Sequence, residues 1–233
     1  MLDDISNRNR AIRAALDLAA ERGWAGVTFT EIAERTGLGL ADLRRDFTCK
    51  TDMLKGFQFE VDAEVLAKIK PATPEQTPRD RLFDLIMTRF EVMAPYKAAL
   101  ARIHAALRCH PGEAVQLLCS TLASQYWMLA GAGAKLNGAG AGLRVTGLAA
   151  IYAKVFRVWL DDTSPGLDRT MAALDRSLQS GEHWLTSMET ACGDFCRFAC
   201  SSLPRGFGRR GTGNGPQPTP ASSSSPSPAA EGV

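Results

Sequence analysis

The sequence predicts an all-α protein, and three observations lead to that prediction. Apolar residues recur at spacings of three and four along most of the chain, which is the period of a helix with one packed side. Glycine or proline follows the end of several of these periodic segments, where helices commonly stop. The chain has 233 residues and 45% of them are apolar, enough for one large helical unit or two small domains with a buried core.

The segment from residue 28 to 54 is predicted to hold two short helices around a tight turn, followed by the start of a third. The first covers residues 30–36, and Gly37 follows at the position where a left-handed backbone costs least. The second helix carries Leu43 and Phe47 on one apolar side. Helix, glycine-containing turn and helix form a helix-turn-helix pattern.

The other helices follow from the same periodicity and from capping residues. An N-terminal helix is predicted over residues 9–21, with Asn7 or Asn9 as its cap. Thr51 is the expected cap of the next helix, and Thr77 with a proline after it is expected to start another. The remaining predicted helices cover 51–69, 77–94 with a break at Pro95, 96–107, 113–129, 143–160, and 166–178 with an extension to residue 200.

These elements predict a helix-turn-helix domain over residues 1–50 and a larger helical domain over residues 51–203. The segment 113–129 is apolar nearly all round, so we expect it to be buried on several sides at the centre of the larger domain. Residues 204–233 consist mainly of Gly, Pro, Ser and Ala. Such a composition cannot offset its ordering entropy, so this tail is predicted to be disordered.

A set of residues between positions 10 and 54 has the spacing of one bacterial family. These residues are Ala15, Ala20, Gly23, Trp24, Val27, Thr28, Ile32, Ala33, Gly37, Leu38, Leu43, Phe47, Lys50 and Leu54. In this framework the chain resembles the DNA-binding domain of TetR-family regulators. The resemblance implies a homodimeric, ligand-responsive repressor that pairs through its last two long helices, here residues 143–160 and 166–178. It also implies DNA contacts from Thr28, Arg44, Arg45 and Lys50.

The second helix of the helix-turn-helix would be the recognition helix, and its charges argue against DNA binding. The family usually has a small hydroxyl residue, an aromatic residue and a histidine or tyrosine where this chain has Asp42, Arg44 and Asp46. Two carboxylates there would be repelled by phosphate. Residues 1 to 60 contain nine Lys and Arg against ten Asp and Glu, without the basic excess expected of a DNA reader. Two interpretations stay open here: a DNA-binding element, or a helix-turn-helix kept only for packing.

A second resemblance covers residues 126 to 178. The run from Ala149 to Tyr152, the run from Val158 to Pro165 and the segment 170–178 are similar to the TetR-fold accessory proteins of ubiquinone biosynthesis. This resemblance implies lipid binding without DNA binding. Between Trp127 and Arg144, however, glycine and alanine replace the polar and aromatic cluster of that family. A dimeric scaffold without either activity is a third hypothesis.

The body of the chain is expected to hold either an apolar ligand or a solid core. Flexible and aromatic side chains on neighbouring predicted helices are typical of an apolar cavity for a lipid or other small molecule. The candidate residues for this pocket are Met87, Phe90, Met93, Tyr126, Trp127 and Met128. Packing of the same side chains into the core is the alternative.

Several kinds of chemistry are not expected. The sequence offers no nucleophile–base pair and no metal-ligand spacing, so we predict a protein that is not an enzyme and needs no cofactor or metal. The six cysteines are expected to be free thiols, and the glycine-rich residues 130–142 lack the pattern of a phosphate-binding loop. With no secretory signal at the start and no long apolar run, a cytoplasmic location is expected.

Overall fold

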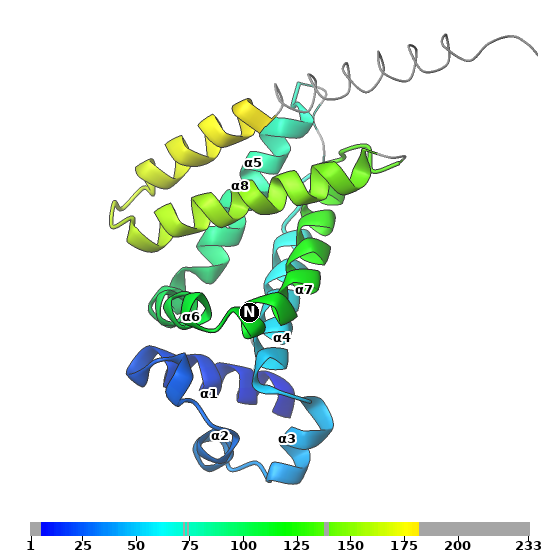
Figure 1. Cartoon of the computed structure of the whole chain (residues 1–233). Coiled ribbons are helices and arrows are strands. Elements are labelled where there is room, and N and C mark those ends of the chain that lie inside the picture. Colours follow the sequence, from blue (N-terminus) through cyan, green and yellow to red (C-terminus); the bar gives the residue numbers. More distant parts are fainter. Residues whose placement is uncertain (1–5, 72, 74, 138–139, 182–233) are drawn as a thin grey trace, which may run out of the picture. The chain divides into compact units, whose positions relative to one another are not determined.

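The computed structural model describes residues 6–71, 73, 75–137 and 140–181, and every regular element in these ranges is helical (Figure 1). The all-α prediction is confirmed. The α-helices are α1 (Asn7–Arg22), α2 (Phe29–Thr36), α3 (Leu40–Asp46), α4 (Lys50–Ala67), α5 (Pro78–Met93), α6 (Lys97–Cys109), α7 (Pro111–Gly131) and α8 (Ala141–Asp161). Two 3₁₀ turns, η1 (Trp24–Gly26) and η2 (Ala94–Tyr96), join them, and a further helical segment covers 168–181.

Local capping explains where several helices begin or end. Gly37 has the expected left-handed backbone, with φ of 69°, and Thr77 caps α5 by accepting a hydrogen bond from the amide of Asp80. The predicted asparagine caps of α1 are wrong, because the hydroxyl of Ser6 accepts from the amide of Asn9 at 3.0 Å. Thr51 is not the cap of α4 either. Cys49 is the N-cap residue instead, and the carboxylate of Asp52 accepts hydrogen bonds from the amides of Thr48 and Cys49, just before the helix.

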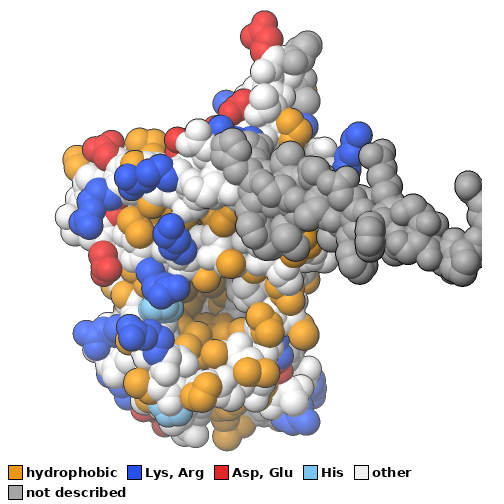
Figure 2. Space-filling view, turned by 45° about the horizontal axis from the view of Figure 1, so that its top comes forward, with side chains coloured by type: hydrophobic (Ala, Val, Ile, Leu, Met, Phe, Trp, Pro, Cys, Tyr) orange, Lys and Arg blue, Asp and Glu red, His pale blue; other side chains and the backbone are white. Residues whose placement is uncertain are grey.

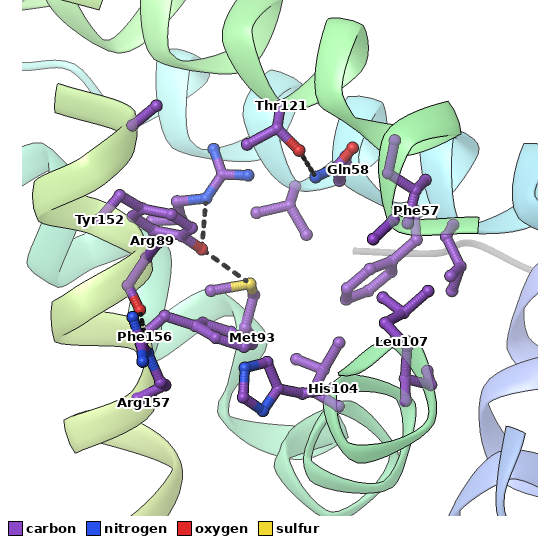
Figure 3. Close-up of a pocket in the computed structure, with 18 of the residues that line it drawn as sticks. Phe57, Gln58, Arg89, Met93, His104, Leu107, Thr121, Tyr152, Phe156 and Arg157 are labelled. Atoms are coloured by element: carbon purple, nitrogen blue, oxygen red, sulfur yellow. Dashed lines mark hydrogen bonds between the residues drawn. The ribbon is translucent and has the colours of Figure 1, made fainter. Parts of the chain in front are cut away.

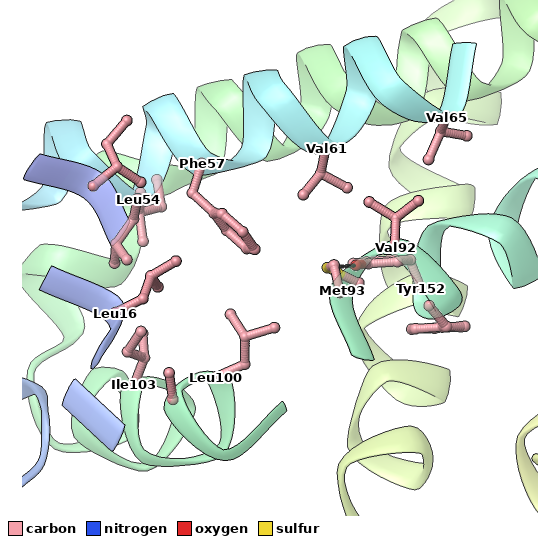
Figure 4. Close-up of a cluster of buried hydrophobic side chains, with 14 of the residues drawn as sticks. Leu16, Leu54, Phe57, Val61, Val65, Val92, Met93, Leu100, Ile103 and Tyr152 are labelled. Carbon is pink, nitrogen blue, oxygen red and sulfur yellow. Dashed lines mark hydrogen bonds between the residues drawn. The ribbon is translucent and has the colours of Figure 1, made fainter. Parts of the chain in front are cut away.

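Helix α1 is buried on two sides, because it packs on α2 and α3 on one side and on α4 and α6 on the other. Its small and apolar residues make this close packing feasible, among them Ile12, Ala15 and Leu16, each at most 1% exposed. Figure 4 shows Leu16 beside Leu54 of α4 and Ile103 of α6. The helix-turn-helix and the body thus share one continuous hydrophobic core.

Helix α4 is the other central element, and it packs on α5 and α7 as well as on α1. All described residues belong to one compact unit, Met1–Cys192. The predicted division at residue 50 therefore stays a prediction, and the predicted tail, 204–233, lies outside the described residues. No helix in the described part of the chain is long and apolar enough to cross a membrane.

Helix α7 is less buried than its sequence predicts. It contacts α4, α5, α6 and α8, but Val115, Leu118, Tyr126 and Trp127 are exposed, with Trp127 at 55%. The expectation that this helix is buried on several sides is wrong for that face. The reason is that the neighbouring helices of the same chain pack only on its other sides.

The connection between α8 and the segment 168–181 is built around Asp162. Its buried carboxylate accepts four hydrogen bonds, from the amide and hydroxyl groups of Ser164 and Thr170, at 2.6 to 3.0 Å. These bonds hold the pKa of Asp162 far below its ordinary value, and the bond from the Ser164 hydroxyl contributes most to this shift. The last described helix therefore starts at residue 168, after a turn, and not at 166.

Replacement of Asp162 by alanine is expected to lower the free energy of unfolding by at least about 2 kcal/mol at pH 7, because bonds to a charged group contribute roughly 1.5–3 kcal/mol each. A carboxylate with a lowered folded pKa stabilises the protein above its unfolded pKa of about 4, and this stability is lost as the pH falls further. The difference between the two proteins should therefore shrink below about pH 4. Urea denaturation at several pH values measures it.

The control is Asp161→Ala, which removes the neighbouring but exposed carboxylate. We expect a change within about 0.5 kcal/mol for that variant. Equal stability of the Asp162 and Asp161 variants at pH 7 would show that the buried carboxylate does not hold this connection.

Candidate functional site

The exposed side of α3 is the first candidate site, and we call Leu40, Arg44 and Arg45 the α3 surface. Leu43 and Phe47 are buried and fix the helix to the core. This orientation leaves Leu40, which is 53% exposed, and Arg44 on the outside. Arg44 has no ion-pair partner among the described residues, whereas Arg45 pairs with Asp42 of the same helix at 2.8 Å. Leu40 was not among the site residues predicted from the sequence.

The other two predicted DNA-contacting residues are engaged in internal contacts. Thr28 caps α2, and its hydroxyl donates to the Oε2 atom of Glu31 at 2.7 Å. Lys50 donates to the backbone oxygen of Trp24 at 2.8 Å, and its Nζ lies 4.7 Å from the centre of that ring. The structure thus presents Arg44 and Arg45 from one helix, while Thr28 and Lys50 stabilise the fold around it. Contact of these four residues with DNA stays a prediction.

Several other charges of the helix-turn-helix join its first two helices. Arg22 pairs with Glu31 at 2.6 Å and Arg35 pairs with Glu21 at 2.8 Å, so two ion pairs tie α1 to α2. Arg10 donates to the last backbone oxygen of α2. Part of the balanced charge of this segment therefore lies in internal pairs, and α3 itself also carries two arginines and two aspartates.

The second candidate site is a cavity of about 500 Å³ in the body (Figure 3). Helices α4, α5, α6, α7 and α8 all contribute side chains to it. Its apolar lining includes Leu54, Phe57, Val61, Met93, Leu100, Ile103, Leu107, Leu117 and Phe156, and its polar lining is Gln58, Arg89, His104, Arg108, Thr121, Tyr152 and Arg157. The volume is that of a typical small-molecule pocket.

This cavity does not lie where the sequence placed it. Of the six predicted pocket residues only Met93 lines it, while Met87, Phe90 and Met128 are packed in the core. Tyr126 and Trp127 are exposed, at 45% and 55%. The reason is helical geometry: α7 faces the cavity with residues 114, 117 and 121, and the same side continues at 124 and 128. Positions 126 and 127 therefore point away.

A buried ion pair that was not predicted from the sequence adjoins the cavity. Arg89 of α5, only 1% exposed, pairs with Asp62 of α4 and donates to Tyr152 of α8 at 3.1 Å. Ser124 of α7 accepts from Arg89 at 2.7 Å and donates to Asp62 at 2.9 Å. Burial by itself would lower the pKa of Arg89, but Tyr152 and Asp62 outweigh it and raise that pKa. The guanidinium therefore stays charged.

Only a weak sequence signal pointed to this pair, since each partner is adjacent to one apolar residue. Asp62 follows the buried Val61, and Arg89 precedes the buried Phe90. A charge at such a position is commonly paired. Nothing in the sequence says which charge is its partner, because the two residues lie on different helices.

Hydrogen bonds connect the cavity wall to the helix-turn-helix. Trp24 of η1 donates its indole N–H to Glu113 of α7 at 2.9 Å. Thr51, in the first turn of α4, donates to Gln116 of α7 at 2.7 Å. The same part of α7 lines the cavity with Ala114 and Leu117. A shift of α7 would therefore disturb the hydrogen bonds made by Trp24 and Thr51.

The variant Asp62→Ala is expected to lower the free energy of unfolding by roughly 3–5 kcal/mol, since it leaves a buried charge without its partner. The double variant Asp62→Leu with Arg89→Met should recover most of that loss, because apolar residues of similar volume often replace a buried pair at little cost. Urea denaturation of both variants measures this. Asp84→Ala, an exposed acid on α5, is the control. If Asp62→Ala lowered the free energy of unfolding no more than Asp84→Ala does, the ion pair would not contribute to stability.

Comparison with known proteins supports the fold. No protein-family model matches the sequence, and no curated protein matches it. Among solved structures, a TetR transcriptional regulator from Nitrosomonas europaea matches with a TM-score of 0.61 and 20% identity, over 76% of this chain and 98% of that one. A TetR transcriptional regulator from Rhodococcus sp. RHA1 matches with a TM-score of 0.53 and 21% identity, over 74% and 93% of the two chains. The chain therefore has the fold of TetR transcriptional regulators.

Proposed function

We propose that the protein is a DNA-binding transcriptional regulator, and that α3 is its recognition helix. The observation that carries the proposal is the α3 surface. On a fold shared with solved TetR regulators, it presents an arginine that no carboxylate of the described chain engages. Arginine commonly reads guanine in the major groove, and an apolar side chain such as Leu40 suits a thymine methyl group.

One of the two acidic residues of α3 has a structural role that is compatible with this function. Asp42 lies in the first turn of the helix, where a carboxylate is stabilised by the helix dipole. It also holds Arg45 through the ion pair, so that Arg45 is oriented along the helix. Asp46 is exposed at the other end of α3 and is the acid expected to oppose phosphate.

The proposed regulator acts as a homodimer and without enzymatic chemistry. A seven-residue recognition helix reaches few base pairs, and a two-fold dimer doubles the site with half-sites about 34–36 Å apart. The surfaces proposed for this contact are α8 and the segment 168–181. Light scattering on the purified full chain would measure its mass in solution, and a monomer would overturn this part of the proposal.

The cavity supplies a route for regulation by a small ligand. Its walls include α4 and α7, and these helices are hydrogen-bonded to η1 and to each other beside the helix-turn-helix. A ligand that changes the position of α7 would therefore change the contacts that hold the helix-turn-helix, α1 to α3, against the body. Ligand binding and DNA binding are then coupled, and each alters the other by the same factor.

The variant Arg44→Ala is expected to weaken binding to a DNA fragment from upstream of its own gene by about 5- to 150-fold, because a good base contact contributes roughly 1–3 kcal/mol. Arg45→Ala should weaken binding less, since that charge is already shared with Asp42. Electrophoretic mobility shifts at several salt concentrations measure both. Asp46→Asn should tighten non-specific binding, because it removes a charge that repels phosphate.

The control is Arg102→Ala, an exposed arginine on α6, far along the chain from α3. Its affinity for the fragment should equal that of the wild type. Absence of binding to any genomic fragment in a selection at about 50 mM salt would end the regulator proposal. The lipid-binding accessory function, which the second resemblance implies, would then be examined by mass spectrometry of an organic extract of the purified protein.

A further inference from the structure

One end of the cavity carries positive charge, and we call His104, Arg108 and Arg157 the rim cluster. His104 and Arg108 lie one turn apart on α6, and Arg157 lies on α8. All three line the cavity. The His104 ring lies 5.9 Å from that of Phe156, the neighbour of Arg157, so the two helices meet at this point. In the view of Figure 3, His104 and Arg157 lie on the side opposite Gln58 and Thr121.

The charge of the rim cluster is not neutralised within the described part of the chain. No salt bridge there involves Arg108 or Arg157, and no Asp or Glu lines the cavity. Burial lowers the pKa of His104, and the nearby charges of Arg108 and Arg157 lower it further. Asp161 is the acid that acts in the other direction. The two arginines are exposed and thus accessible to a ligand.

The rest of the cavity is suited to an apolar group. Figure 2 shows a hollow with a hydrophobic surface and Lys or Arg side chains along one side of it, close to a histidine. The only other charged lining residue, Arg89, is already paired with Asp62. Tyr152 is likewise bonded to Arg89. The interior therefore presents satisfied polar groups and many apolar side chains, which favours a tail without hydrogen-bonding groups.

We propose that the cavity binds an amphipathic carboxylate, with its anionic head at the rim cluster and its apolar tail in the interior. Arginine pairs with a carboxylate through charge-assisted hydrogen bonds that a neutral head cannot make. The tail would extend towards Leu54, Phe57 and Ile103. Leu54 and Ile103 lie beside Leu16 of α1 (Figure 4), so the tail would end under the helix that supports the helix-turn-helix.

This inference names the ligand class of the proposed regulator, but its test needs no DNA. Decanoate, decanol and decylammonium share one tail and differ in head group, so their affinities for the full-length protein isolate the effect of charge. We expect decanoate to bind about tenfold more tightly than decanol, because hydrogen bonds to charged groups are the stronger ones. Isothermal titration calorimetry measures the three affinities. Decylammonium should bind most weakly.

The variants Arg108→Gln and Arg157→Gln should each reduce the preference for decanoate over decanol, and the double variant should abolish it. Affinity for decanol should be unchanged in all of them, which shows that the cavity is intact. Arg102→Gln, which removes an exposed arginine of α6 outside the cavity, is the matched control and should keep the full preference.

A second measurement tests directly whether the head group lies at the rim cluster. The sequence has three histidines, so the His104 ring signal can be assigned by comparison with His104→Gln and followed by NMR. A bound carboxylate at the rim cluster should raise the pKa of His104, and decanol should not. Equal affinity for decanoate and decanol, or an unchanged pKa of His104 with decanoate bound, would overturn the inference. Neither result would affect the mobility-shift test of DNA binding.

Discussion

The body of this protein depends on one buried ion pair. Asp62, Arg89, Ser124 and Tyr152 come from four different helices, α4, α5, α7 and α8. Burial of a charge costs several kcal/mol unless its partners satisfy it, so these helices are held at the spacing that satisfies Arg89. The cavity lies against this cluster. Because Arg89 and Tyr152 satisfy each other, the cavity can be apolar in character although it borders a full charge.

Local features of the fold could be predicted from the sequence, because their signals lie within a few residues. The end of α2 at Gly37 and the start of α5 at Thr77 each follow from one capping residue and its close neighbours. The cap of α1 could not be chosen in this way, since Ser6, Asn7 and Asn9 all have the required side-chain oxygen and only the backbone decides between them.

Tertiary features of the candidate site could be predicted only in part. The pattern of Leu43 and Phe47 correctly gave the buried side of α3, and hence the exposure of Arg44. The cavity residues depend on which side of α7 meets the other helices, and an apolar pattern all round that helix does not contain this information. The partner of Arg89 was equally hidden, because Asp62 lies 27 positions away in the sequence. The rim cluster needs α6 and α8 side by side, which no local pattern reveals.

The contact between Trp24 and α7 has a consequence for observing the molecule. The indole is buried, donates to the carboxylate of Glu113, and has the ammonium group of Lys50 near its ring. The emission of an indole is sensitive to charges and water close to it. Separation of α7 from η1 would remove the carboxylate and admit water at the same time. The protein therefore contains an intrinsic fluorophore at the junction between its cavity and its helix-turn-helix. In a variant without the other three tryptophans, movement at this junction can be followed without attaching a dye.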